Sequence, residues 1–329
     1  MRRFFALMVF LAALAAGAAA FWVNHRLSLS TDTVDLTVAP GMSARAVAQT
    51  LVEAGVQTNP WFMFVWFRLS GDARQIKAGS YEIERGATPV TLLAKLVRGE
   101  QALRSVTLVE GWTFTQVRAA LQKAEHLVQT TQGLEPDSVM KSLGRPGVHP
   151  EGRFFPDTYT YAKGSTDLAV LKRALQAMDE RLAQVWQQRA PNSPLKTSEE
   201  ALILASIIEK ETGVPSDRPL VAGVFVNRLR IGMRLQTDPT VIYGLGEAFD
   251  GNLRRRDLLA DTPWNTYTRA GLPPTPIAMP GQASLWAAVQ PGATQALYFV
   301  ARGDGSSQFS TSLIDHNRAV NRYQRGLTP

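Results

Sequence analysis

Cysteine is absent from the 329-residue chain, and its absence excludes several kinds of site. No disulfide framework, zinc–thiolate centre or cysteine nucleophile can form, and a lipoprotein anchor is excluded because it needs an acylated cysteine. The four histidines, at positions 25, 126, 149 and 316, are scattered and show no metal-binding spacing such as H-E-x-x-H. A glycine-rich phosphate loop and a G-x-S-x-G nucleophile motif are also missing. We therefore expect neither a metal nor a nucleotide cofactor.

The composition is that of a globular protein with an excess of basic residues. Hydrophobic residues make up 45% of the chain and charged residues 19%, and the formal net charge is +7. This length allows about two domains, each large enough to bury a core. A positive charge favours a polyanionic partner, which could be nucleic acid, anionic lipid or an anionic wall polymer, and charge alone does not choose among them.

The N-terminus carries the longest apolar segment. Residues 4–23 are uncharged and long enough to cross a hydrocarbon core of about 30 Å as a helix, and Trp22 marks an interfacial end. Because Arg2 and Arg3 precede the segment, residues 1–3 are predicted to be a cytoplasmic tail and everything after residue 23 to lie outside. The alternative is a signal peptide cleaved after Ala18-Ala19-Ala20. Either placement makes nucleic acid an unexpected partner.

A short pattern occurs three times after the polar linker at residues 24–33. Gly41, Gly86 and Gly111 each follow a run of strand-forming residues. Each glycine is followed by a hydroxyl residue at +2 and by aliphatic residues at +6 and +10. The pattern predicts a strand, a glycine turn and an amphipathic helix with a Ser or Thr N-cap. The first two copies resemble the LysM-like module, a βααβ fold that binds N-acetylglucosamine polymers. We therefore assign residues 34–104 to such a module.

Residues 197–213 (TSEEALILASIIEKETG) form the most informative predicted helix. Thr197 is its expected N-cap, and Gly213 and Pro215 end it. At about 100° per residue, Glu211 falls on the midline of the apolar face, whereas Glu209 falls on the opposite side with Ala205 and Ser206. Burial and the negative end of the helix dipole would both raise the pKa of Glu211, as a general acid requires. The competing interpretation is a carboxylate that turns outward or pairs structurally with an arginine.

Further motifs decide between these interpretations. They read EGRFFPDTY at 151–159, FVNRLRIGMRLQTDPTVIYG at 225–244, NTYT at 265–268, GLPPTPIAMPG at 271–281 and FSTSLIDHNRAVNRY at 309–323. With the ASIIEKET string they closely resemble the YceG-like family of endolytic murein transglycosylases. The resemblance runs from the N-terminal anchor to near the C-terminus and maps the family's catalytic glutamate onto Glu211. One departure is Gln308, where family members often have a histidine, and this position is left out of the catalytic set.

The resemblance implies cleavage between N-acetylmuramic acid and N-acetylglucosamine without external water. One carboxyl group protonates the leaving oxygen and then, as a carboxylate, deprotonates the C6 hydroxyl that closes a 1,6-anhydro ring. The paired carboxylates of most glycoside hydrolases are therefore not required. The resemblance also implies a bacterial inner-membrane enzyme that acts on nascent peptidoglycan strands and ends their elongation, with penicillin-binding synthases as partners.

Four polar residues are predicted to bind the sugars, because amides hydrogen-bond hydroxyl and N-acetyl groups and tyrosine adds a stacking face. They are Gln236, Asp238, Asn265 and Tyr267. Three more are placed behind them, namely Glu151, Arg228 and Tyr243. Each could instead be structural: Asp238-Pro239 as a turn or cap, Arg228 on a helix surface and Tyr243 in the core.

The expected fold class is α+β, with one transmembrane helix, a LysM-like βααβ module and a mixed α/β catalytic domain over residues 105–329. Three other functions remain open. A hydrolytic muramidase would add a second carboxylate, for which Asp238 is the candidate. A non-catalytic peptidoglycan-binding scaffold would not need Glu211. A protein that only binds anionic lipid would explain the charge but not the motifs.

The first prediction concerns the N-terminal segment. Because the apolar run continues through Phe21, Trp22 and Val23 beyond the candidate cleavage site, we expect the segment to be retained as an anchor. Intact-mass measurement of the membrane-extracted protein should give a chain that includes residues 4–23. A mature chain that begins at Phe21 would instead identify a signal peptide.

Overall fold

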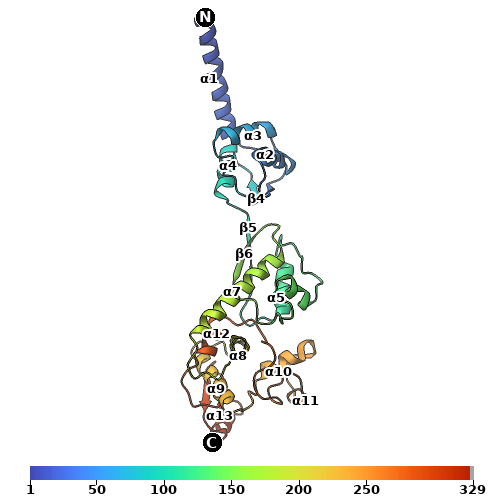
Figure 1. Cartoon of the computed structure of the whole chain (residues 1–329), viewed down its shortest axis with the longest axis vertical. Helices are drawn as coiled ribbons and strands as arrows, with labels where there is room; N and C mark the ends of the chain where they lie inside the picture. The colour runs from blue at the N-terminus through green and yellow to red at the C-terminus, as the bar shows by residue number, and fades with distance from the viewer. Residues whose placement is uncertain (327–329) are drawn as a thin grey trace. The chain divides into compact units, whose positions relative to one another are not determined.

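The computed structural model describes residues 1–326, and the chain divides into two compact units (Figure 1). Unit 1 contains Met1–Arg104 with Thr160–Ser165, and unit 2 contains Ser105–Tyr159 with the chain from Thr166 onward. The strands β5 (Leu103–Thr107) and β6 (Thr158–Ala162) pair with each other and carry the chain from one unit to the other and back. Helices and strands occur in both units, so the fold is a mixed α/β one, as expected.

Unit 1 begins with α1 (Arg2–Asn24), the one helix among the described residues that is long and apolar enough to cross a membrane. Its side chains are exposed from Arg2 to Phe21. Only at its end do Trp22 and Val23 pack into the core of unit 1. A helix with this surface is suited to lipid rather than water, in agreement with the predicted anchor.

The rest of unit 1 is a two-stranded antiparallel sheet covered by three helices. The strands β2 (Thr33–Val38) and β4 (Gly79–Glu84) pair with Leu36 opposite Tyr81. Alternate residues of β2 point into a core shared with α2 (Ala44–Glu53), α3 (Pro60–Leu69) and α4 (Pro89–Arg98). A second, short pair joins β1 (Ser28–Leu29) to β3 (Val56–Gln57). Apart from the two-residue strand β3 between α2 and α3, the order from β2 to β4 is a βααβ arrangement, whereas the likeness to LysM stays a prediction.

The three copies of the sequence pattern adopt the same local structure. Gly41, Gly86 and Gly111 have φ values of 79°, 96° and 76°, in the left-handed region that glycine enters without steric cost. After them, the hydroxyls of Ser43, Thr88 and Thr113 accept hydrogen bonds from the first turns of α2, α4 and α5 (Phe114–Lys123). The prediction of a repeated strand–turn–helix unit is confirmed.

Unit 2 is built mainly from helices. After α5 come α6 (Pro136–Ser142), α7 (Asp167–Gln187), α8 (Ser198–Glu211), α9 (Arg218–Arg230), α10 (Asp238–Leu245), the 3₁₀ turn η1 (Gly246–Ala248), α11 (Arg255–Leu259), α12 (Gln282–Val289) and α13 (Leu313–Tyr323). Its strands, apart from those shared with unit 1, are β7 (Tyr298–Ala301) and β8 (Ser307–Ser310), which pair antiparallel.

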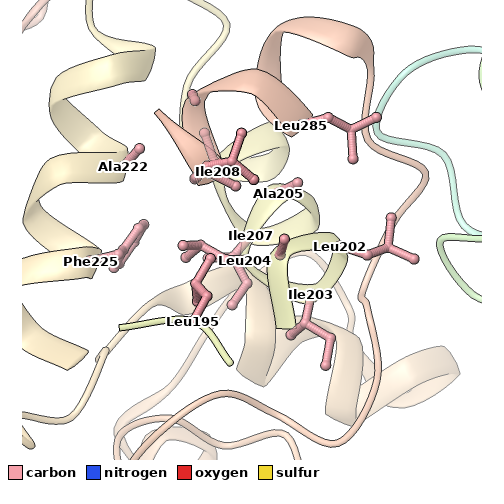
Figure 2. Packing of buried hydrophobic residues seen from close by; sticks show 14 of the residues in the cluster. Leu195, Leu202, Ile203, Leu204, Ala205, Ile207, Ile208, Ala222, Phe225 and Leu285 are labelled. Carbon is pink, nitrogen blue, oxygen red and sulfur yellow. The ribbon is translucent and has the colours of Figure 1, made fainter. Parts of the chain in front are cut away.

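Helix α8 lies at the centre of unit 2 and is buried on all sides (Figure 2). Phe225 of α9 packs on one side of it and Leu285 of α12 on another. The side opposite Glu211 is buried too, because Ala205 and Ser206 are both inaccessible to solvent. Ser206 is accommodated by donating its hydroxyl to the carbonyl of Ile203 and accepting the amide N–H of Ile277. A buried central helix needs apolar or internally satisfied residues all round.

Candidate active site

Helix α8 delivers Glu211 to the edge of the core in its last turn. The hydroxyl of Thr197 caps the start of the helix by accepting the N–H of Glu200 at 3.2 Å. The helix ends at Glu211 because Thr212 has extended backbone angles. Eight buried residues of α8 fix the helix against its neighbours, so the position of Glu211 is set by the core rather than by a loop.

Glu211 lines a cavity of about 580 Å³ in unit 2. Its walls come from α9, the segment that leads into α10, the β7–β8 hairpin and α13. The polar and aromatic residues that line it are Glu211, Phe225, Arg228, Gln236, Asp238, Tyr267, Tyr298, Phe299, Ser307, His316 and Gln324. Three of the four predicted sugar-binding residues, Gln236, Asp238 and Tyr267, are therefore brought together with Glu211.

The carboxyl group of Glu211 is held in one orientation and is largely removed from water. The hydroxyl of Thr237 donates a hydrogen bond to its Oε1 atom. Burial raises the pKa of Glu211 from 4.5 to about 7; the Thr237 hydrogen bond and the Arg228 charge oppose this rise, and the Asp238 charge adds to it. A group with this pKa exists in both protonation states near neutrality, which suits proton donation and proton removal by the same carboxyl.

The segment Gln236–Asp238 forms the wall opposite α8 and adopts a constrained backbone. Gln236 has φ of 51°, a rare value for a residue with a side chain. Its N–H donates to the carbonyl of Thr266 at 3.2 Å, and the N–H of Thr237 donates to the Thr266 hydroxyl at 3.1 Å. Strained backbone of this kind persists only where the surroundings hold it, and such positions are concentrated at functional sites.

The side chains of Asp238 and Tyr267 form a pair at the cavity. The hydroxyl of Tyr267 donates to Oδ1 of Asp238 at 2.6 Å. Burial and this acidic partner raise the pKa of Tyr267, so the phenol keeps its proton. Asp238 thus accepts a hydrogen bond from tyrosine and adds negative potential near Glu211.

Arg228, Tyr298 and His316 stack along another wall. The buried guanidinium of Arg228 donates to the carbonyls of Leu297 at 2.7 Å and Leu235 at 2.5 Å, and it lies 5.2 Å from the centre of the Tyr298 ring. The Tyr298 ring also stacks on the ring of His316, with ring centres 5.2 Å apart. Burial and the Arg228 charge lower the pKa of His316, which favours its neutral form. His316 thus lines the cavity as a ring packed on Tyr298.

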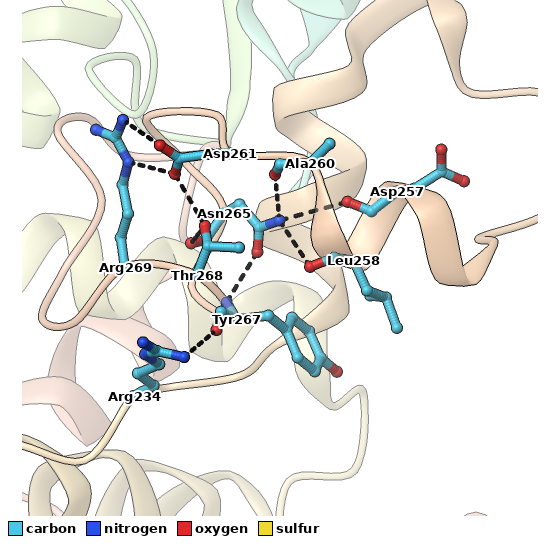
Figure 3. A network of polar contacts seen from close by, with 9 residues as sticks. All are labelled: Arg234, Asp257, Leu258, Ala260, Asp261, Asn265, Tyr267, Thr268 and Arg269. Atoms are coloured by element: carbon cyan, nitrogen blue, oxygen red, sulfur yellow. Dashed lines mark hydrogen bonds and ion pairs between the residues drawn. The ribbon is translucent and has the colours of Figure 1, made fainter.

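Asn265 does not line the cavity, and its predicted role in sugar binding is corrected. Its side chain is fully buried and donates to the carbonyls of Asp257, Leu258 and Ala260 (Figure 3). Its Oδ1 atom accepts the N–H of Tyr267 at 2.8 Å. Asn265 therefore ties the C-terminal end of α11 to the backbone of Tyr267, and its effect on a substrate passes through that tyrosine.

Glu151 and Tyr243 also lie outside the cavity lining. The buried carboxyl of Glu151 accepts the N–H of Phe114 at 3.0 Å and the hydroxyl of Tyr243 at 3.2 Å. Burial raises the pKa of Glu151 to about 7 and raises that of Tyr243 further above its usual range. The pair joins the N-terminus of α5 to α10.

Glu209 faces away from the cavity and is nevertheless buried. Its side chain is 8% exposed, accepts the N–H of Gly281 at 2.9 Å and lies 4.0 Å from the guanidinium of Arg218. A Cβ atom at Gly281 would collide with the carboxylate of Glu110, so a side chain at this position would displace that carboxylate. The two glutamates of α8 thus have different surroundings, one at the cavity and one in a structural hydrogen bond.

Comparison with known proteins now identifies the chain. A sequence model of the YceG-like family matches residues 36–322. The chain belongs to the YceG-like family. This confirms the resemblance found in its motifs.

Individual YceG-like relatives extend this result. An endolytic murein transglycosylase of Bacillus subtilis is 31% identical over 89% of this chain and 86% of its own length. One of Streptococcus pneumoniae is 27% identical over 95% of this chain, which spans 63% of that longer protein. A crystal structure of a YceG-like protein from Listeria monocytogenes is similar with a TM-score of 0.53 and 29% identity, and it covers 88% of this chain and 99% of that one.

The sequence did not single out Thr237 or Tyr298 as site residues. Thr237 stands inside the QTDP string, between two residues that were singled out, so its place there was an available signal. Tyr298 lies on a strand far along the chain, and nothing local marks it. Gln308, which stands where YceG-like proteins often have a histidine, accepts a hydrogen bond from Arg302 at 2.7 Å and does not line the cavity of Glu211. Within residues 1–326, no three His, Asp or Glu side chains gather as a metal site would require.

The raised pKa of Glu211 makes stability depend on pH. Between its unfolded value of 4.5 and its folded value of about 7, the folded chain binds more protons than the unfolded chain, so this group lowers stability as pH rises. Glu211→Gln keeps the Thr237 hydrogen bond without the charge. We expect it to be more stable than the parent above pH 7, by about 3 kcal/mol, with the difference vanishing near pH 4.

Thermal unfolding across this pH range in the same detergent measures the difference, and comparison with the parent cancels the titration of Glu151. Glu209→Gln is the matched control, because it weakens a buried contact with Arg218 and should lose stability throughout the range. A Glu211→Gln variant that is no more stable than the parent above pH 7 would contradict the burial of this charge.

Proposed function

We propose that this chain is an endolytic murein transglycosylase in which Glu211 is first the acid and then the base. The observation that carries the proposal is a single glutamate with a pKa of about 7 at the wall of a 580 Å³ cavity, oriented by Thr237. The YceG-like membership and the names of its relatives in Bacillus subtilis and Streptococcus pneumoniae supply the substrate and the reaction class. That class is a carbon–oxygen lyase acting on peptidoglycan.

In the first step, protonated Glu211 donates its proton to the glycosidic oxygen between N-acetylmuramic acid and N-acetylglucosamine. The bond from that oxygen to C1 breaks, and the N-acetylglucosamine end leaves as an alcohol. The positive charge that develops at C1 lies near the newly formed carboxylate of Glu211, which stabilises it. Asp238 raises the pKa of Glu211 and Arg228 lowers it. Their opposite effects help to keep this pKa near neutrality, where the group can both donate and accept a proton.

In the second step, the carboxylate of Glu211 takes the proton of the C6 hydroxyl on the same sugar, and the C6 oxygen bonds to C1. This closes the 1,6-anhydro ring and returns Glu211 to its protonated state. Because the nucleophile belongs to the substrate, its effective concentration can reach roughly 10⁵–10⁸ M. The reaction therefore requires neither a water nucleophile nor a second base to activate one. Asp238 already accepts the hydroxyl of Tyr267, which favours an orienting role over that of a second catalytic carboxylate.

The surrounding residues are proposed to hold the sugars. Gln236 offers an exposed amide to hydroxyl and N-acetyl groups, and Tyr267 offers a ring and a hydroxyl. Tyr298 extends the aromatic wall. The glycan-binding LysM-like module over residues 34–104, the catalytic domain over 105–329, and a role beside penicillin-binding synthases in ending nascent strands belong to the same proposal. So does a bacterial inner-membrane location, for which α1 is the support.

The two glutamates of α8 give a test of the assignment. Glu211→Gln retains the shape of the side chain and removes its proton, so cleavage of glycan strands should fall by on the order of 10²–10⁴-fold or more. Glu209→Gln should keep most activity at temperatures where it is folded, since Glu209 does not line the cavity. Turnover is measured by liquid chromatography of digested strands, with circular dichroism to confirm folding. Equal activity in the two folded variants would remove Glu211 from its role.

Product analysis separates the transglycosylase from the hydrolytic muramidase. We expect uncrosslinked strands to be cut internally, leaving 1,6-anhydro-N-acetylmuramic acid ends that do not change on borohydride reduction. These ends are lighter than hydrolysed and reduced ends by one water and two hydrogens. Digestion in oxygen-18 water should leave them unlabelled. Ends that take up the label would identify a muramidase with Asp238 as its second carboxylate, and intact strands would favour the non-catalytic scaffold.

A further inference from the structure

Helix α3 in unit 1 presents an apolar face that nothing in the described chain covers. Its inner side, with Met63 and Phe67, is fully buried in the core. Its outer side has Trp61 at 59% exposure, Phe62 at 50% and Leu69 at 80%. Large apolar side chains gathered on one exposed helix face indicate a contact with a partner or a membrane.

This face is continuous with the end of α1. The ring of Trp22 meets that of Phe62 edge-on with centres 5.9 Å apart, and Phe62 meets Trp61 at 5.8 Å. Trp22 also packs against the core of unit 1, so this chain of aromatic rings is fixed and not a chance contact of a free helix end. In Figure 1, α3 lies at the end of unit 1 from which α1 leaves.

Basic side chains lie beside the apolar face. Arg68 of α3, with Arg45 and Arg74, lines a cavity of about 820 Å³ whose apolar lining includes Phe64. No acidic side chain lines this cavity, and none of the three guanidinium groups has an ion pair or hydrogen bond among residues 1–326. Unpaired arginines beside exposed tryptophan and leucine match the two layers of a membrane surface, anionic headgroups and acyl chains.

We propose that α3 lies in the interface of the bilayer that α1 spans, with Trp61, Phe62 and Leu69 at the boundary between headgroups and acyl chains and Arg68 at the headgroups. The depth follows from α1: if its apolar part spans the hydrocarbon core, Trp22 lies at that boundary, and Phe62 in contact with it lies there too. The inference rests on α1 being an anchor, which is part of the proposed function. A second copy of the chain is less suited to this face, because the three unpaired arginines of one copy would then lie near those of the other and repel them.

The absence of cysteine makes a direct test possible, because one introduced cysteine is the only site of labelling. The full chain carrying Leu69→Cys is spin-labelled and reconstituted in nanodiscs of phosphatidylethanolamine with a minority of phosphatidylglycerol. Leu103→Cys is the matched control, since Leu103 is also an exposed leucine, at 56%, but on β5. Relaxation by oxygen, which enters the acyl region, is compared with relaxation by a water-soluble nickel chelate.

We expect the ratio of oxygen to nickel accessibility to be several-fold higher at residue 69 than at residue 103. Adding Trp61→Gln and Phe62→Gln to the Leu69→Cys chain should lower this ratio, because it removes the rings that are proposed to hold α3 in the bilayer. Both rings are exposed, so their replacement does not open the core. Equal ratios at the two positions would overturn the proposal. Protection of residue 69 from both reagents, with dipolar broadening between labels, would identify a second copy on this face and also overturn it. Neither outcome depends on strand cleavage, so the test is separate from that of Glu211.

Discussion

The withdrawal of one carboxyl group from water is the interaction on which the site depends. Glu211 stands where the buried helix α8 meets the cavity, and its pKa of about 7 arises mainly from burial. A carboxyl on a loop could avoid that cost by turning to solvent, whereas a residue fixed by the core of unit 2 cannot. Burial of this carboxyl lowers the stability of the fold. The same burial gives the group a pKa at which it can donate a proton and accept one at neutral pH.

The groups around Glu211 have opposing effects on its protonation. Arg228 and the hydroxyl of Thr237 favour its carboxylate, and Asp238 favours its protonated form. Arg228 is itself fixed by the carbonyls of Leu235 and Leu297, and Asp238 is fixed by the hydroxyl of Tyr267. Asn265 and Thr266 hold Tyr267 and the Gln236–Thr237 backbone in turn. The cavity wall is thus a set of charges whose distances are determined by backbone hydrogen bonds, which is the form that electrostatic preorganisation takes in proteins.

Local patterns in the sequence were enough to predict several helix starts and to single out Glu211 as a candidate. Glycine turns followed by Ser43, Thr88 and Thr113 signal three helix starts by chemistry that needs no tertiary contact. The period of α8 places Glu211 on an apolar face. The burial of Ala205 and Ser206, by contrast, depends on α12 packing from the far side, and a helical wheel contains no information about how many neighbours a helix has.

Asn265 shows the same limit within the site itself. Its amide was expected to meet a sugar because amides recognise sugars, yet the same amide satisfies three backbone carbonyls of a turn equally well. Residue type alone cannot separate these uses, since both require only donors and acceptors at hydrogen-bond distance. What separates them is whether the groups within reach belong to the chain or to the cavity, and that is decided by the path of α10 and α11. The two glutamates of α8 obey the same rule: Glu209 finds Gly281 and Arg218 within reach, and Glu211 finds Thr237 and open space.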